Sequence, residues 1–205
     1  MALLVEQSHT KLAKSLHWTF IILYVYGIFK QVNDLQELED KGILIFEIIF
    51  ASIFLAIVIL RYSYMRRFKT FLGARNTVHI VHYYLARSVH KAMYACFILL
   101  PLTGLIIAGL YTQGYTVNAT PDEEQTIMDV VLDLHGAVAD LSYILIFIHI
   151  AAAVYSRVKG EGVWSSMVPV LKENKPTNNQ FIKKMADFED KIYDKVASIF
   201  STKKK

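Results

Sequence analysis

Four long apolar runs constrain this chain more than any other feature. They lie at about residues 15–32, 42–61, 90–110 and 134–156. Each approaches the roughly 20 residues that an α-helix needs to cross the hydrocarbon core of a bilayer. Because lipid offers the backbone no hydrogen-bond partners, such runs cross as helices. The sequence therefore predicts an all-α integral membrane protein whose residues 1–170 form a four-helix bundle.

The first run follows Lys11 and Lys14, a basic start that is also typical of signal peptides. It has no small-residue cleavage site, and its segment "HWTFIILYVYGIF" is bulky throughout, so we expect it to remain as a span. Glu47 interrupts the second run and Pro101 the third. Membrane helices tolerate a proline with a kink.

Composition agrees with a membrane protein and excludes several other classes. Hydrophobic residues make up 54% of the 205 residues, and the mean hydropathy is +0.35. The net charge of +4 comes from basic residues placed between apolar runs, a pattern that indicates membrane topology rather than nucleic-acid binding. The single cysteine, Cys96, allows no internal disulfide, and no cysteine pair exists for a zinc finger or an iron–sulfur cluster.

The connections between the runs differ in charge. Residues 61–91 contain no acid but seven basic residues: Arg61, Arg66, Arg67, Lys69, Arg75, Arg87 and Lys91. The connection before the fourth run contains no base but five acids: Asp122, Glu123, Glu124, Asp129 and Asp133. Basic connections stay on the cytoplasmic side. We therefore expect a multi-pass protein of the inner (cytoplasmic) membrane with both termini in the cytoplasm.

Residues 171–205 are expected to form a cytoplasmic amphipathic tail. Apolar residues recur there at spacings of three and four, which predicts a helix with one apolar stripe. The stripe consists of Phe181, Met185, Phe188, Ile192, Val196 and Ile199. The helix leads to a terminal "KKK" that suits anionic lipid, so the tail is expected to dock on a partner or on the inner membrane surface.

Two histidines, His135 and His149, lie in the fourth run. Fourteen residues separate them, so they share one helix face and stand roughly 21 Å apart along the axis. At that distance they cannot bind the same small ion, but each could bind its own planar cofactor. For any one histidine within a membrane helix, the alternative is a hydrogen bond to another helix.

His17 lies at the inner end of the first run, and His149 lies near the inner end of the fourth. Two imidazoles at one depth on different helices are the ligand set of six-coordinate haem iron. Such a haem transfers electrons and leaves no open iron position for oxygen chemistry.

Three segments resemble the prokaryotic cytochrome b561 family: "KSLHWTF", "LLPLTGL" and "LHGAVADLSYILIFIHIAAAVYS". The resemblance covers about residues 10–170 and extends to the haem b subunits of hydrogenases. It implies a four-helix membrane cytochrome with one histidine on the first span, one on the second and two on the fourth. Carried over, His17 and His149 would bind an inner haem b, and His135 would bind an outer one.

The second span departs from this pattern because Glu47 stands where the family carries its histidine. A carboxylate is a poor substitute for imidazole on haem iron. Three readings remain: one haem only, an outer haem that His135 shares with an unusual ligand, or a ligand from another subunit. We favour one inner haem b. Glu47 is then either a protonatable carboxyl group or a side chain that reaches the outer interface.

Other polar residues near the inner end have weaker assignments. The resemblance implies that His90, which opens the third span, lies beside a quinone site, and an imidazole there could carry quinol protons. Arg87, Lys91 and Lys14 could pair with haem propionates. We read His79 and His82 as solvated loop residues. Asp140 could orient His135 or form a hydrogen bond between helices.

The favoured function is a haem b electron carrier that links a redox partner to the quinone pool, as a component of a respiratory chain. In the resembled family some members oxidise superoxide to reduce ubiquinone, and others are subunits of larger complexes. The acidic outer connection suits a basic cytochrome c. No nicotinamide fingerprint, P-loop or catalytic triad is visible. The alternative is a non-redox or partly haem-loaded accessory subunit of a larger membrane complex.

Overall fold

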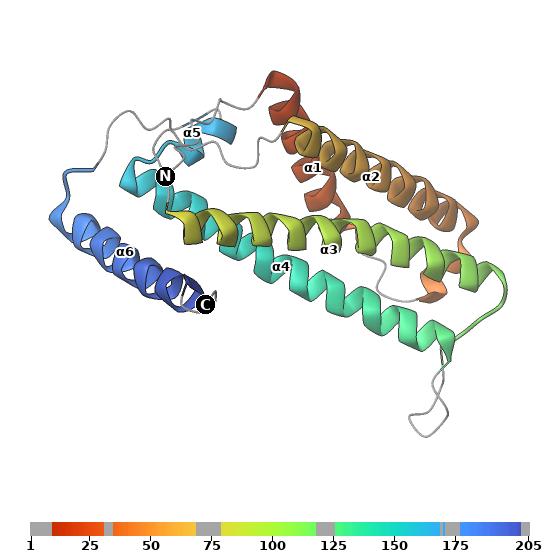
Figure 1. The fold of residues 1–205 in the computed structure, drawn as a ribbon. Helices are drawn as coiled ribbons and strands as arrows, with labels where there is room; N and C mark the ends of the chain where they lie inside the picture. The colour runs from red at the N-terminus through yellow and green to blue at the C-terminus, as the bar shows by residue number, and fades with distance from the viewer. Residues whose placement is uncertain are drawn as a thin grey trace. The chain divides into compact units, whose positions relative to one another are not determined.

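The computed structural model describes residues 10–30, 35–68, 79–117, 126–168, 170 and 177–201, and these residues include no β-strand. Four helices are long and apolar enough to cross a membrane: α1 (Lys11–Phe29), α2 (Lys41–Phe68), α3 (Ile80–Thr112) and α4 (Ile127–Lys159) (Figure 1). The predicted all-α, four-span architecture is therefore confirmed. Three shorter elements complete it: the 3-10 helix η1 (Leu35–Glu39), α5 (Val163–Met167) and α6 (Gln180–Ser201).

The helices do not end where the apolar runs end. α2, α3 and α4 begin earlier or continue later than the predicted spans, and α1 ends at Phe29 rather than at residue 32. Hydropathy marks the part of a helix that suits lipid, whereas Lys, Arg and Glu at its ends keep high helix propensity. Polar ends of all four spans therefore remain helical, since α1 likewise begins at Lys11 rather than at residue 15.

Contacts divide the chain into two compact units, each described by itself. The bundle unit consists of Ser15–Tyr64 and Met93–Leu145, and so contains most of α1, the main part of α2, and segments of α3 and α4. The tail unit consists of Met1–Lys14, Met65–Ala92 and Ile146–Lys205. It contains the beginning of α3, the end of α4, α5 and α6.

Aromatic rings fill the centre of the bundle unit. Phe97 of α3 is 2% exposed, and its ring centroid lies 4.6 Å from that of Phe20 and 5.3 Å from that of Tyr24, both on α1. Phe54 of α2 lies 5.3 Å from Phe20. The Tyr24 hydroxyl is 2.6 Å from Oγ of the fully buried Ser142 on α4. Ser142 itself donates to the Ala139 carbonyl, so Tyr24 donates to Ser142. This centre thus connects all four helices.

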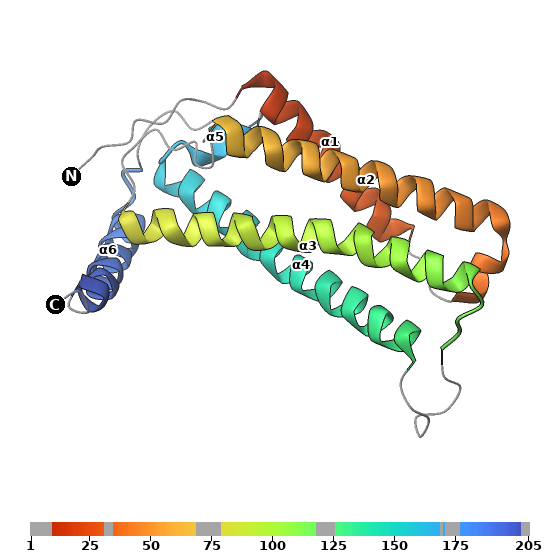
Figure 2. The same ribbon diagram turned by 45° about the vertical axis from the view of Figure 1, so that its right-hand side comes forward.

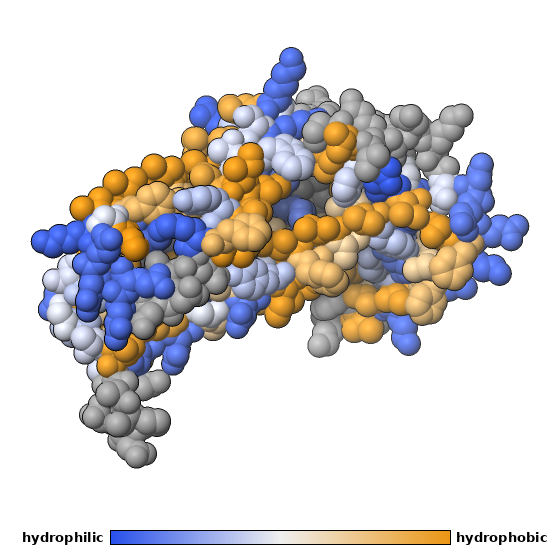
Figure 3. All heavy atoms as spheres, turned by 180° about the vertical axis from the view of Figure 1, so that it is seen from behind, coloured by the Kyte–Doolittle hydropathy of each residue, from blue (hydrophilic) through white to orange (hydrophobic). Residues whose placement is uncertain are grey.

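The outward face of the helices is apolar. Ile22, Ile45 and Ile144 are each more than half exposed, and Figure 3 shows hydrophobic side chains running along the helices. Such a surface would be an aggregation hazard in water and is what lipid requires. α3 is the most enclosed span, with 39% of its apolar window buried against 11% for each of the other three.

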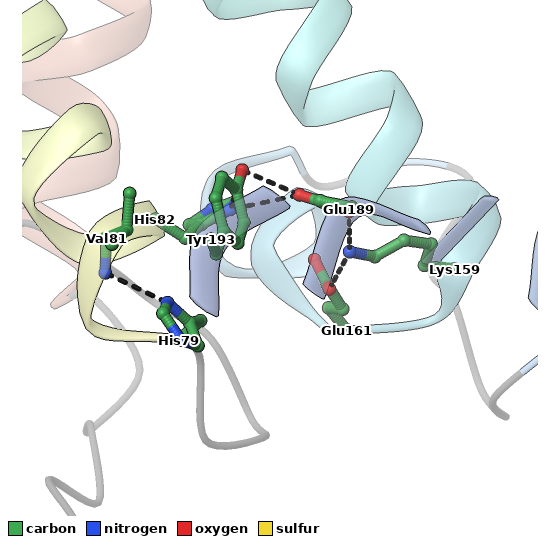
Figure 4. Close-up of polar contacts among 7 residues, drawn as sticks. All are labelled: His79, Val81, His82, Lys159, Glu161, Glu189 and Tyr193. Atoms are coloured by element: carbon green, nitrogen blue, oxygen red, sulfur yellow. Dashed lines mark hydrogen bonds and ion pairs between the residues drawn. The ribbon is translucent and has the colours of Figure 1, made fainter. Parts of the chain in front are cut away.

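In the tail unit, charged side chains hold α6 against the ends of two spans (Figures 2 and 4). Lys159, the last residue of α4, lies 2.8 Å from Glu189 of α6 and 2.6 Å from Glu161. The Tyr193 hydroxyl donates to Glu189 at 2.7 Å, and His82 in the first turn of α3 lies 3.6 Å from the same carboxylate. We call these five residues the latch.

The contacts of α6 correct one expectation, because the side chains of His79 and His82 are not solvated but lie against this helix. The side chain of His79 is 22% exposed, bonds Asp194 at 3.2 Å and stacks on Tyr193 at 5.4 Å between centroids. That of His82 is 21% exposed. Their partners lie more than 100 residues further along the chain, so no local pattern could indicate them.

The latch also changes acid–base behaviour. Burial alone would raise the pKa of Glu189, but hydrogen bonds from Lys159 and Tyr193 outweigh it and hold the pKa below its ordinary value. Burial, followed by the hydrogen bond to Glu189, raises the pKa of Tyr193. Glu189 is therefore ionised and Tyr193 protonated at neutral pH.

Tyr24→Phe removes the interhelical hydrogen bond to Ser142 while keeping the ring. We expect it to lower the free energy of unfolding by about 0.6–1.7 kcal/mol, the range measured for such bonds in membranes. The measurement is SDS-induced unfolding in detergent micelles. Tyr26→Phe is the matched control, because Tyr26 is 45% exposed. Equal effects of the two variants would contradict a stabilising role for the buried bond.

Glu189→Gln should loosen α6 at neutral pH, because the amide cannot replace the carboxylate that three groups share. Tryptic cleavage at the α6 lysines should become several-fold faster than in the unchanged protein. A carboxyl group whose pKa is lowered on docking contributes stability above its ordinary pKa, and that stability is lost as the pH falls through the lowered value. Cleavage that is unchanged in Glu189→Gln would show that the latch does not hold α6.

Candidate functional site

The bundle unit encloses a cavity of about 990 Å³. This volume lies at the upper end of the range of about 300–1,000 Å³ that ligand sites occupy. All four spans contribute walls, among them Tyr24 of α1, Glu47 of α2, Gly104 of α3 and His135 of α4. Aromatic and aliphatic side chains form most of the rest. The cavity therefore has the size and the largely apolar lining of a ligand site.

His135 contacts this cavity as a half-buried side chain, and its orientation is set by α3. Its Nδ1 lies 2.8 Å from the Thr103 hydroxyl. That hydroxyl donates its one hydrogen to the Leu99 and Leu100 carbonyls, at 2.8 and 3.0 Å, so it accepts from Nδ1–H of His135. Nε2 is then the unprotonated nitrogen, which is the form that binds a metal. The expected hydrogen bond of His135 is thus present, on the nitrogen that leaves Nε2 for a ligand.

Glycines leave room beside His135. A Cβ at Gly104 would stand 3.7 Å from Cε1 of His135, and a Cβ at Gly136 would meet nothing within 4 Å. Gly27, on the α1 wall, is needed for close helix packing, since a Cβ there would lie 3.3 Å from the Phe50 ring. The three glycines therefore make space and allow α1 and α2 to approach.

Glu47 lines the same cavity and forms an ion pair with Lys30 at the end of α1. Lys30 also lies over the Phe46 ring, with Nζ 4.1 Å from the centroid. Sequence reasoning did not single out Lys30, although its place near the end of the first run indicates that it can reach an acid near the start of the second. Glu47 is therefore a paired carboxylate on the wall of the cavity.

His17 and Arg61 meet in the bundle unit, where α1 begins and α2 approaches its end. Nη2 of Arg61 lies 2.9 Å from Nδ1 of His17. Arg61 is only 8% exposed and lies over the Phe20 and Tyr94 rings, at 5.8 and 5.3 Å from the centroids. Within the described part of the chain, its buried Nε has no hydrogen-bond partner. A buried cation with a spare donor is suited to binding an anion.

His149 and His90 contact each other in the tail unit. Their ring centroids are 4.9 Å apart, with the planes nearly perpendicular. Nδ1 of His90 lies 2.6 Å from the Ala86 carbonyl, which can only accept, so Nδ1 carries the proton and Nε2 is an acceptor. The structure thus brings together two of the predicted site residues that the sequence placed on different spans.

The remaining candidate residues lie apart from these contacts. Arg87 donates to the Tyr83 hydroxyl at 3.3 Å, and its buried Nε, like that of Arg61, has no partner among the described residues. Asp140 lines the cavity one turn beyond His135. Lys91 and Lys14 lie on α3 and α1, as expected. Among the described residues, no three His, Cys, Asp or Glu side chains gather as a metal-ion site.

The model of a family described as prokaryotic cytochrome b561 matches residues 8–170. This range includes all four spans and ends before α6. Searches of curated proteins and of solved structures find no significant match.

Proposed function

This chain belongs to the prokaryotic cytochrome b561 family of membrane haem b electron-transfer proteins, and we propose that it passes electrons between a redox partner and the quinone pool. We place it in a respiratory chain of the inner (cytoplasmic) membrane. The observation that carries the proposal is the pair His17–Arg61. In this pair an imidazole lies beside a buried guanidinium whose Nε has no hydrogen-bond partner in the described chain.

His17 and His149 are the proposed ligands of an inner haem b. Haem b would supply one-electron transfer, and the imidazoles of His17 and His149 would hold it. Haem carries two propionates, and Arg61 and Arg87 are the proposed partners for them, because each presents a buried Nε without a partner in the described chain. Lys91 and Lys14 are further candidates for the propionates.

The hydrogen bond of His17 bears on this assignment. A guanidinium can only donate, so Nδ1 of His17 accepts and is unprotonated. Histidines that bind a metal through Nε2 carry their proton on Nδ1. Ligation through Nε2 therefore requires Arg61 to turn away from His17. A haem propionate, which is charged, would be a better hydrogen-bond partner for the Arg61 guanidinium than the neutral imidazole of His17.

His90 is the proposed acceptor of quinol protons. Its ring contacts that of His149, so a quinol bound to His90 would lie next to a haem ligand. Its Nε2 is the nitrogen that can accept, because Nδ1 donates to Ala86. The titration of an imidazole near neutral pH suits this role.

The cavity beside His135 is proposed to lack a haem in the isolated chain. His135 has the tautomer of a ligand, but the wall formed by α2 offers Glu47, which is already paired with Lys30. A paired carboxylate does not replace the second imidazole. His135 then remains hydrogen-bonded or receives a ligand from another subunit.

The proposed orientation places both termini in the cytoplasm, because residues 61–91 carry only basic charges. The acidic connection before α4 then faces outward, where it would suit a basic cytochrome c as redox partner.

His17→Ala and His149→Ala should each abolish the low-spin haem b spectrum of the dithionite-reduced protein, because either change removes one axial ligand. His79→Ala is the control, since it removes an imidazole that bonds Asp194 of α6 and should leave the spectrum unchanged. Full haem content with an unchanged spectrum in both variants would contradict the ligand assignment.

Glu47→His should raise the haem content from one per chain toward two, because it places an imidazole on the cavity wall that faces a ligand-ready His135. The haem-to-protein ratio is measured by pyridine haemochrome. Glu47→Gln removes the charge without adding a ligand and should leave the ratio at one. Adding Gly136→Leu to Glu47→His should block the gain by filling the cavity. Two haems in the unchanged, isolated chain would overturn the one-haem proposal.

The alternative is an accessory subunit with little or no haem, which the missing histidine on α2 favours. The reduced spectrum and haem ratio of the unchanged protein decide between the two. Low-spin haem b at one per chain supports the electron carrier. Protein that folds and assembles without haem supports the accessory subunit.

A further inference from the structure

α6 lies outside the residues that match the family, and it presents three distinct faces. The face that docks on the tail unit consists of half-buried side chains: Ile182, Ala186, Glu189, Tyr193 and Ala197. The apolar stripe is not that face. Five of the six stripe residues, Phe181, Met185, Phe188, Ile192 and Ile199, are between 41% and 66% exposed, and Val196, where the stripe meets the docked face, is half-buried.

The angle between the two faces follows from the chain itself. Four stripe residues each precede a docked residue by one position, as Phe188 precedes Glu189 and Ile192 precedes Tyr193. One residue turns an α-helix by about 100°, so the stripe points roughly at right angles to the docking direction. The latch therefore fixes the rotation of α6 and leaves most of its apolar face uncovered by the protein.

Most charges of α6 are sorted around the stripe, and Lys183, which lies opposite the stripe among the acids, is the exception. Lys184, Lys191 and Lys195 lie within about 90° of its centre, on the side away from the docked face. Asp187, Asp190 and Asp194 lie about 130–170° from it. Lysines beside an apolar face can extend their chains along lipid and reach the head groups, whereas acids turn towards water.

The latch also determines which ends of the membrane helices α6 lies beside. It joins α6 to the last residue of α4 and to the first turn of α3, which are the ends of two membrane helices. Figures 1 and 2 both show α6 next to the beginning of α3. A helix held there lies within about 12 Å of the apolar runs, because Lys159 follows the fourth run by three residues and His82 precedes the third by eight.

We propose that α6 lies in the membrane–water interface, with the Phe181–Ile199 stripe in lipid and Lys184, Lys191 and Lys195 against anionic head groups. The partner of the stripe is thus the phospholipid surface, rather than a second copy of the chain or another protein. The latch orients the helix, and the bilayer covers the face that the protein leaves exposed.

The test uses the full chain, with its haem, reconstituted into vesicles of phosphatidylcholine and phosphatidylglycerol. Cys96→Ala provides a background without cysteine, and Phe188→Cys and Asp190→Cys place a fluorescent label on the stripe and on the opposite face. Lipids brominated near the glycerol end of the acyl chain should quench the label at 188 several-fold more than the label at 190. Ile199→Cys repeats the measurement at a second stripe position.

Equal quenching at the two positions would overturn the proposal. A label at 188 that is shielded from aqueous iodide but not quenched by brominated lipid would also overturn it, because a protein would then cover the stripe. These outcomes do not depend on electron transfer, so they are independent of the proposed function.

The lysines are tested in the labelled Phe188→Cys chain. Changing Lys184, Lys191 and Lys195 to Gln should reduce the difference in quenching between anionic vesicles and vesicles of phosphatidylcholine alone. Changing Asp187 and Asp190 to Asn is the matched control and should not reduce it. An unchanged difference in the lysine variant would show that head-group charge does not hold the helix.

Discussion

Polar side chains within a membrane bundle must find partners on other helices, and this constraint organises the bundle unit. Tyr24 bonds Ser142, Thr103 bonds His135, Lys30 pairs with Glu47, and Arg61 bonds His17. Each pair connects two different spans. Since lipid supplies little hydrophobic drive between helices, such pairs and close packing set which faces meet. The same contacts orient the imidazoles, so the fold and the candidate site rest on one set of interactions.

The sequence predicted the features that depend on short stretches of chain. Apolar runs of about 20 residues identified the four spans, and the histidine spacing placed His135 and His149 on one helix, α4. It did not predict partners distant in the chain. Glu47 was expected to be a protonatable carboxyl group or a side chain that reaches the outer interface, because nothing near it in the second run indicates an ion pair with Lys30. Nor were Thr103 and Arg61 recognised as partners of His135 and His17. Their pairing depends on which faces of the helices meet.

In the tail, too, the features set by neighbouring residues were predicted, and the contacts with distant residues were not. Periodicity predicted the helix and its stripe correctly, yet the face that docks is the one beside it. Amphipathic helices in water dock through their apolar face. Here Lys159, His82 and Glu189 form a polar attachment instead, and such an attachment cannot be derived from hydropathy. An exposed stripe on a helix tied to the ends of two spans is consistent with a bilayer as its remaining neighbour.

The two ends of the bundle unit differ in how their charges are balanced, and this difference supports a single haem. At the cavity, Lys30 and Glu47 neutralise each other, so no spare cation awaits the propionates of a cofactor. At the beginning of α1, Arg61 is buried beside a neutral imidazole, and within the described chain its Nε has no partner. A buried, uncompensated cation is costly, and an anionic group that binds it recovers that cost. A dianionic cofactor would therefore recover that cost at the end with His17, whereas Lys30 at the end with His135 is already paired with Glu47.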